Sequence, residues 1–209
     1  EYSDAEAQLK LALDDIERAY GSQHPKLATV AYNLGAAQYE ARKLDHAKAS
    51  WERSRAILEV NFGATDLRLN DVTSALASVA MSEGRDAEAR DEFEAILRRL
   101  DAADQGQTYE AALAHSNLSM AARHLGEVEV ALAHARSSVE IMQRVRPLTH
   151  PEVGIARQGL ARALAAAGRV DEALREAQRA VVIVDAALPE DHPVREEAAE
   201  TLRDLSADR

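Results

Sequence analysis

The side chains of this sequence best suited to acid–base chemistry or metal binding near neutral pH are its seven histidines. A metal site or a general base needs such groups at a fixed spacing, for example one helical turn apart. His115 and His124 are nine residues apart, which fits neither an HExxH pattern nor a zinc finger. His46 and His134 are isolated along the chain. These four histidines therefore predict no metal site.

The other three histidines stand directly before proline, at His24, His150 and His192. Proline is favoured at the first position of a helix, where no backbone N–H is needed, so each His-Pro pair is typical of a helix start. We interpret these histidines as turn residues and expect no catalytic role for them.

Other catalytic patterns are missing from the sequence. Asp14, Asp15 and Glu17 lie close together, but on a polar helix face that offers no apolar pocket to raise a carboxyl pKa. The chain has no cysteine, no phosphate-binding Gly-rich loop and no GxSxG motif. We therefore predict that it is not an enzyme and that it needs no metal or cofactor.

The composition narrows the classes of partner and of fold. A net charge of −11 without a basic stripe argues against nucleic acid. No apolar run reaches the roughly 20 residues that span a bilayer, and the first residues do not resemble a signal peptide, so we expect a cytoplasmic protein without membrane contact. Aromatic residues make up only 4% of the chain, and its apolar mass of Ala, Leu and Val favours close-packed helices.

A repeat of 42 residues organises the sequence. Steps of 42 from His24 reach Asp66, Thr108, His150 and His192. Asp and Thr are good helix N-caps, so all five positions predict a helix start even where His-Pro is missing.

Further positions keep the same phase. Glycines occur between the two apolar stretches of each unit, where a helix ends in the left-handed region, and Arg42 takes the corresponding place in the first unit. The repeated positions are Leu34, Leu76, Leu118 and Leu160; Ala47, Ala89, Ala131 and Ala173; and Gly84, Gly126 and Gly168. Each unit therefore predicts two helices joined by a short turn.

We expect residues 1–209 to form a single solenoid. Its parts are a second helix of an incomplete repeat (1–21), four full repeats (24–65, 66–107, 108–149 and 150–191) and a capping helix (192–209). The expected helices span 4–20, 25–41, 45–61, 67–83, 86–101, 109–125, 128–144, 151–167, 171–187 and 193–205.

The segments HPKLATVAYNLGAAQYEARKLDHA and HPEVGIARQGLARALAAAGRVDEA resemble the 42-residue tetratricopeptide repeat of the kinesin light chain type. The second and third repeats depart from this pattern because they lack His-Pro. The resemblance implies an all-α fold, namely a right-handed α-solenoid of stacked antiparallel helix pairs. It also implies that the first helices line a concave groove.

The expected groove positions are unusually poor in charge and rich in small, amide and Met side chains, which suits a bound peptide. The resemblance implies that an Asn of the first helix holds the ligand backbone. Asn33 and Asn117 match that position, whereas Ala75 and Gly159 do not. The predicted groove residues are Tyr32, Asn33, Tyr39, Ser74, Ser78, Met81, Ser116, Asn117, Met120, Arg123, Gln158 and Arg162.

The first predicted helix lacks a preceding partner, as in a fragment of a longer protein. We expect this to leave Leu9, Leu13 and Ile16 partly bare, as a face for self-association. The acidic last helix is expected to act as the polar cap that a solenoid needs.

Three functions follow from this reading. The leading hypothesis is a non-catalytic scaffold that binds a protein or peptide ligand in its groove, as part of a larger regulatory or assembly protein. The alternatives are a sensory or autoinhibitory domain that responds to a signalling peptide or a neighbouring catalytic domain, and a self-assembly element.

Overall fold

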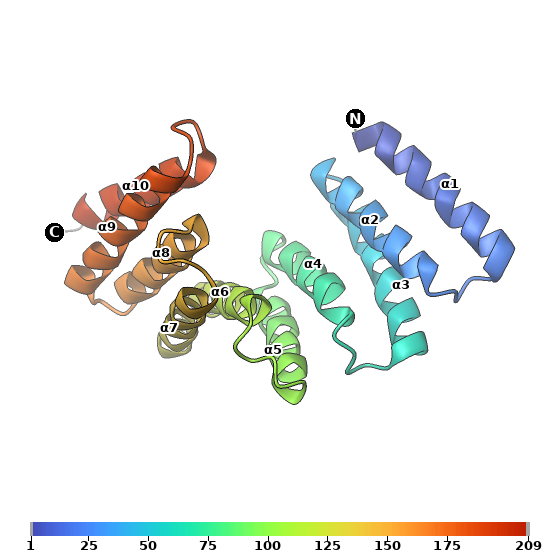
Figure 1. The fold of residues 1–209 in the computed structure, drawn as a ribbon, viewed down its shortest axis with the longest axis horizontal. Helices are drawn as coiled ribbons and strands as arrows, with labels where there is room; N and C mark the ends of the chain where they lie inside the picture. Colours follow the sequence, from blue (N-terminus) through green and yellow to red (C-terminus); the bar gives the residue numbers. More distant parts are fainter. Residues whose placement is uncertain (1, 208–209) are drawn as a thin grey trace. The chain divides into compact units, whose positions relative to one another are not determined.

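The computed structural model describes residues 2–207, and within this range it contains ten α-helices and no strand (Figure 1). The helices are α1 (Tyr2–Tyr20), α2 (Lys26–Glu40), α3 (Leu44–Phe62), α4 (Leu69–Ser82), α5 (Asp86–Ala102), α6 (Tyr109–His124), α7 (Val128–Val145), α8 (Pro151–Ala166), α9 (Val170–Ala187) and α10 (Pro193–Ala207). The expected all-α class of stacked helix pairs is confirmed. None of these described helices is both long and apolar enough to cross a membrane.

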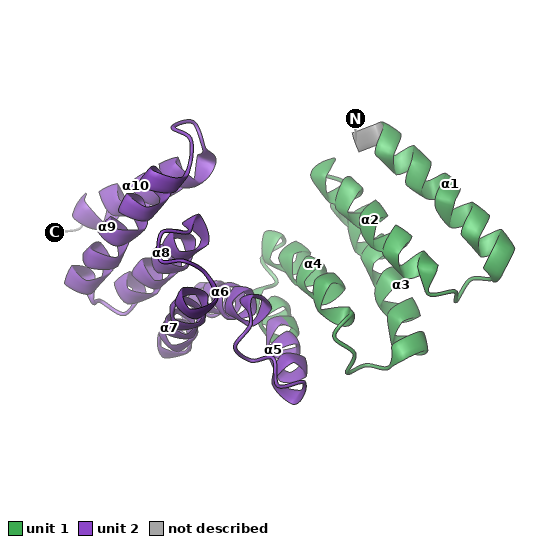
Figure 2. Ribbon diagram, in the orientation of Figure 1, with its two compact units in different colours: residues 1–92 green, residues 93–209 purple. Residues whose placement is uncertain are grey.

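The chain divides into two compact units, one ending at Glu92 and the other beginning at Phe93, so that the boundary falls inside α5 (Figure 2). In the first unit, α2 packs against both α1 and α3, and α3 also contacts α4. In the second unit, α6 to α10 pack each against the next, and the alternate helices α6, α8 and α10 also touch. That residues 1–209 form a single solenoid stays a prediction.

Buried alanines allow this close packing of neighbouring helices. In the second unit Ala121 and Ala122 of α6 and Ala131 of α7 are fully buried. Small side chains let two backbones approach each other, and larger residues such as Leu118 and Leu164 fill the space between successive helices.

The turn between the two helices of a repeat has the backbone that the register predicted. Gly84, Gly126 and Gly168 have φ of 73°, 74° and 71°, and Arg42 has a φ of 60° at the equivalent place. The amide after this residue closes the helix end, as where Lys43 N donates to the Gln38 carbonyl oxygen at 2.9 Å. Arg42 is therefore a non-glycine residue held in the left-handed region.

Replacing Arg42 with glycine is expected to raise the free energy of unfolding by up to about 1 kcal/mol, because glycine adopts this φ without steric cost. The side chain of Arg42 is exposed, so little packing is lost. Urea denaturation measures the change. The matched control is Gly84→Ala: an added Cβ meets no atom within 4 Å, so only its φ of 73° opposes the substitution. A lower melting temperature for the Arg42 variant would contradict the prediction.

The His-Pro histidines cap the helix starts. In His24, His150 and His192 the Nδ1 atom accepts a hydrogen bond at 3.3 Å from the backbone N–H two residues later. Where His-Pro is missing, Asp66 Oδ1 accepts from Arg68 N at 2.9 Å and Thr108 Oγ1 from Ala111 N at 3.3 Å. Each of the five repeat-start residues thus accepts a hydrogen bond from a backbone N–H at or just before the start of a helix, and Thr108 and His150 are the N-cap residues themselves.

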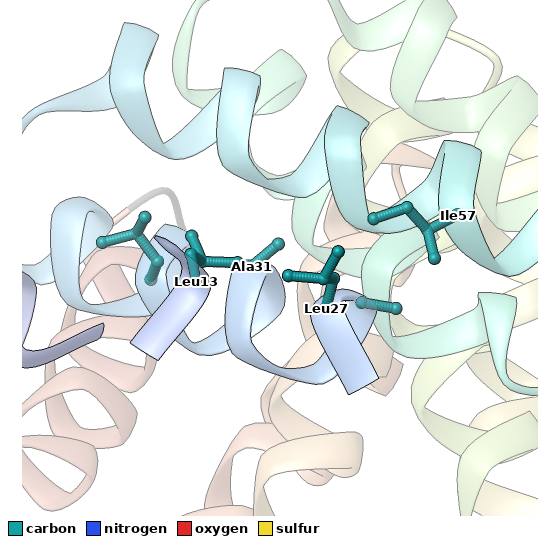
Figure 3. Close-up of a cluster of buried hydrophobic side chains, with 6 residues drawn as sticks. Leu13, Leu27, Ala31 and Ile57 are labelled. Atoms are coloured by element: carbon teal, nitrogen blue, oxygen red, sulfur yellow. The ribbon is translucent and has the colours of Figure 1, made fainter. Parts of the chain in front are cut away.

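Leu13 of α1 is buried against α2, which corrects the expectation that it is partly bare, whereas Leu9 and Ile16 are partly exposed as expected. Leu13 is only 5% exposed and belongs to a core cluster with Leu27, Ala31 and Ile57 (Figure 3). Leu9 and Ile16 pack against the same cluster. The reason is that α1 packs on α2 as any second helix packs on the next first helix. Self-association through α1 stays a prediction, which no longer includes Leu13 and depends on the partly exposed Leu9 and Ile16.

A buried carboxylate also ties α1 to the first repeat. Glu6 accepts hydrogen bonds from Lys10 Nζ and Lys43 Nζ, both at 2.7 Å, and from Gln38 Nε2 at 3.4 Å. These donors lower the pKa of Glu6 to about 2, with Lys10 the strongest influence. The carboxylate therefore stays charged and anchors α1 beside the turn at Lys43.

Candidate functional site

Three first helices of the second unit, α6, α8 and α10, enclose a hollow of about 230 Å³. Small, amide and apolar side chains line it together with two arginines. The lining residues are Ser116, Asn117, Ser119, Met120 and Arg123 of α6; Ile155, Gln158, Gly159 and Arg162 of α8; and Val194 and Glu197 of α10. The structure therefore brings together six of the predicted groove residues.

The apolar part of this hollow is open to solvent. Met120 of α6 is 38% exposed and Ile155 of α8 is 40% exposed. Leu113, which precedes Ile155 by one repeat, is also exposed on α6. Large apolar side chains exposed beside one another in a hollow are typical of a binding site rather than of a solvated helix face.

The polar part of the hollow is fixed by contacts between α8 and α10. Gln158 is only 3% exposed, and its Nε2 donates to Thr201 Oγ1 at 3.0 Å. Arg162 donates to Thr201 Oγ1 and to Glu197 Oε1, each at 3.0 Å. Gln158 thus supports the floor of the hollow, whereas Arg162 and Glu197 lie at its surface.

A second hollow of about 410 Å³ continues from the first, and Arg123 and Arg162 line both. Its other walls are Ala165 and Ala166 of α8 and the acidic face of α10. Arg123 lies close to His124, whose Nε2 is 3.2 Å from the Arg123 Nη2 atom. Because Arg123 and Arg162 line both hollows, the two hollows form one continuous groove, which we call the α6–α8–α10 groove.

A polar cluster at the start of α6 and α8 holds these two helices together. The Tyr109 hydroxyl donates to Glu152, and Arg146 makes an ion pair with the same carboxylate at 2.9 Å. The Arg146 guanidinium also lies 4.4 Å from the centre of the Tyr109 ring. The hydrogen bond to Glu152 raises the pKa of Tyr109. Two of the groove walls are thereby fixed to each other.

The predicted groove residues of the first unit are more scattered. Tyr32 lines a separate hollow of about 240 Å³ between α2, α3 and α4, and burial raises its pKa. The Tyr39 ring packs against Trp51 with ring centres 5.7 Å apart and planes tilted by 42°, which gives it a packing role. Asn33 is exposed outside that hollow.

Three further residues, Ser74, Ser78 and Met81, are half-buried on α4. None of them lines the hollow that contains Tyr32, and Ser78 Oγ donates to the Ser74 carbonyl oxygen at 2.9 Å. A ligand role for these side chains stays a prediction.

Sequence reasoning missed the part that α10 plays in the groove. The last helix was expected to be only a polar cap, yet Val194, Glu197 and Thr201 complete the walls. The signal was present in the register, because Glu197 and Thr201 follow Ile155 and Gly159 by 42 residues. The capping helix therefore occupies the place of one more first helix.

The interpretation of His134 as isolated is wrong. Its Nδ1 atom is 2.8 Å from Nδ1 of His115, and the rings stack with centres 5.0 Å apart. One repeat later, the equivalent positions hold the ion pair of Arg157 and Glu176. A contact across 19 residues cannot be seen from spacing along one helix, although the register shared with the ion pair could have indicated it. Among the described residues no group of three or more His, Asp or Glu is placed to hold a metal ion.

Helix pairs stacked on one another, with a groove between first helices, define an α-helical repeat protein. The model of the tetratricopeptide repeat family matches residues 109–184. This match covers two of the repeats, and the fold of the chain is that of kinesin light chain-like repeat structures. Such a fold supports a scaffold for protein interaction.

Solved structures share this fold at low sequence identity. The chain is similar to BtubC (BKLC) from P. vanneervenii, with a TM-score of 0.82, 16% identity, and coverage of 99% of this chain and 83% of that one. It is also similar to a protein described as a kinesin light chain from Podosopora anserina with nearly identical TPR-like repeats, with a TM-score of 0.73, 21% identity, and coverage of 89% and 90%. No curated protein matches the sequence.

Proposed function

We propose that the chain is a non-catalytic scaffold that binds a segment of a partner polypeptide in the α6–α8–α10 groove. The observation that carries the proposal is the combination of exposed Met120 and Ile155 with the amide of Asn117 in one hollow. Apolar side chains provide contact area, and a side-chain amide both donates to and accepts from a peptide backbone. This combination suits a peptide better than a small metabolite, because the groove is long and open.

Arg123 and Arg162 line the groove and are the groups with which a carboxylate of the ligand would pair. Arg162 is already paired with Glu197 at 3.0 Å, so a ligand carboxylate would compete with a group of this chain. A regulatory role in response to a peptide or a neighbouring domain would use the same groove. Within residues 2–207 no separate feature favours that alternative over a plain scaffold.

The experiment selects peptides from a random displayed library on the purified chain and measures their affinity by fluorescence anisotropy. Asn117→Ala is expected to weaken binding about ten-fold, because the peptide loses hydrogen bonds to the amide. The control is Ser137→Ala, on the other helix of the repeat.

Circular dichroism verifies that each variant keeps its helicity. Undiminished binding by a folded Asn117→Ala variant that also carries Met120→Glu would contradict the proposed groove.

A further inference from the structure

A second surface, formed by the fourth repeat and by Leu148 just before it, combines exposed aliphatic side chains with arginines. Leu148 and Val182 are 63% and 69% exposed, and both line a shallow cavity of about 380 Å³. This surface, called the α9 patch here, consists of Leu148, Arg157, Arg175, Gln178, Arg179, Val182 and Ile183. It shares no residue with the α6–α8–α10 groove.

The repeat itself shows that the aliphatic side chains are not required by the fold. The positions 42, 84 and 126 residues before Val182 hold Glu140, Arg98 and Ala56. The register of Leu148 holds Gly106 and Ala64 in the earlier repeats. Charged or small residues serve at these positions elsewhere, so packing does not explain a large exposed aliphatic side chain here.

The same comparison applies to Arg175. The positions of Arg175 in the three earlier repeats hold Ala133, Asp91 and Ala49. The fourth repeat thus carries a basic residue where the others carry none.

The charge of the α9 patch is opposite to that of the whole chain. Its lining contains three arginines and no carboxylate, in a chain of net charge −11. Glu176 beneath it pairs with both Arg157 and Arg179, the latter at 2.6 Å. Arg175 is exposed and makes no ion pair with a carboxylate of the described residues, although Glu172 lies near enough to influence it. The patch therefore keeps a positive excess.

The geometry of the patch is linear. Arg175, Arg179 and Val182 are separated by four and three residues, so they lie on one face of α9 along about 10 Å of its axis. A row of this kind matches the side chains of a second helix packed alongside, since ridges at this spacing fit the grooves of a neighbour.

We propose that the α9 patch binds an amphipathic helix of a protein partner, with aliphatic side chains on one face and Asp or Glu beside them. The aliphatic side chains meet Leu148 and Val182, and the carboxylates meet Arg175 and Arg179. Nucleic acid fits less well, because phosphates gain nothing from the two aliphatic side chains and are repelled by the rest of the chain. The scaffold then has two separate docking surfaces.

The test uses a fluorescent synthetic helix of about five turns that carries leucines on one face and glutamates beside them. Its affinity for the full chain is measured by anisotropy at low and moderate salt. Arg175→Glu and Val182→Glu are each expected to weaken binding at least about ten-fold, and salt is expected to weaken it further. Two controls, Arg144→Glu on α7 and Asn117→Ala in the groove, are expected to leave this affinity unchanged.

Several results would overturn the proposal. The first is that the acidic helix does not bind. The second is that a version of the same helix with lysines in place of glutamates binds equally well. The third is that Arg144→Glu weakens binding as much as Arg175→Glu does. A loss of binding in Asn117→Ala would assign the peptide to the groove instead. Self-association that Val182→Glu abolishes, measured by sedimentation without peptide, would assign the patch to a second copy of the chain.

Discussion

Replacing Trp51 with alanine is expected to lower the free energy of unfolding by about 3–5 kcal/mol, the largest stability loss expected from a single change in the first unit. Trp51 is only 4% exposed, and its cluster includes Leu69 and Val72 of α4. Its Nε1 also donates to the Tyr32 carbonyl oxygen at 3.0 Å. The alanine variant would lose the ring that joins α2, α3 and α4 and leave a cavity. Urea denaturation followed by circular dichroism measures the loss.

The space for this ring comes from a glycine. A Cβ atom added to Gly35 would lie 2.6 Å from Trp51 ring atoms, so Gly35→Ala is expected to be destabilising by about 2 kcal/mol. One repeat later, the two positions hold Ala77 and Phe93. Combining Gly35→Ala with Trp51→Phe should therefore cost less than the sum of the single changes, by at least about 1 kcal/mol. Strictly additive losses would show that glycine is not there to accommodate the indole.

Acidification is expected to destabilise the second unit through the pair of His115 and His134. Burial, and to a smaller degree the neighbouring His134, lower the pKa of His115 from 6.5 to about 4. Burial also lowers the pKa of His134. Between pH 6.5 and about pH 4 the unfolded chain therefore binds more protons than the folded chain. The stabilising contribution is complete above pH 6.5 and falls as the pH falls toward 4.

The chemistry of the pair explains the direction of this effect. Between the two Nδ1 atoms, one imidazole must donate and the other must accept, so at least one ring must be neutral. Asp101 opposes the lowering at His115, and Glu94 opposes it at His134, and both carboxylates lie on α5. Since the rings are only partly buried, we expect a loss of about 2 kcal/mol between pH 7 and pH 4.5.

The matched variant replaces the pair with the one found at the same register one repeat later, as His115→Arg with His134→Glu. Arg157 and Glu176 show that the fold accepts an ion pair there. Carboxylates elsewhere in the chain respond to acid equally in both proteins, so the difference between their stability profiles isolates the two histidines. Equal slopes of stability against pH between 5 and 7 would contradict the assignment.

The histidine pair also lies close to the proposed groove. His115 directly precedes Ser116 and Asn117 on α6, which line the hollow. The contact between His115 and His134 holds α6 against α7. It therefore helps to fix the position of α6, the helix that presents the amide of Asn117 to the groove. Groove binding is best measured above pH 6.5, where both rings are neutral.

Much of the local structure could be predicted from the sequence, for a specific physical reason. The 42-residue register located the capping residues such as Thr108, because an N-cap acts on backbone amides two or three residues away. It also located the left-handed turn at Arg42, because helix termination depends on one residue's φ. Both interactions are local, so their signals are carried by adjacent residues.

Contacts between helices were decided by the tertiary structure. The register placed Gln158 on the groove face, but the hydrogen bond to Thr201 of α10 buries it. His134 pairs with His115 because two helices pack at that point, and Leu13 is buried because α2 covers it.

The sequence by itself thus determined the period, the helices, their ends and the resemblance to a repeat family. The tertiary structure decided which side chains meet and where hollows remain. The physical reason is that periodicity fixes the face on which a residue lies, whereas its contacts depend on the size and rotamer of residues from other helices.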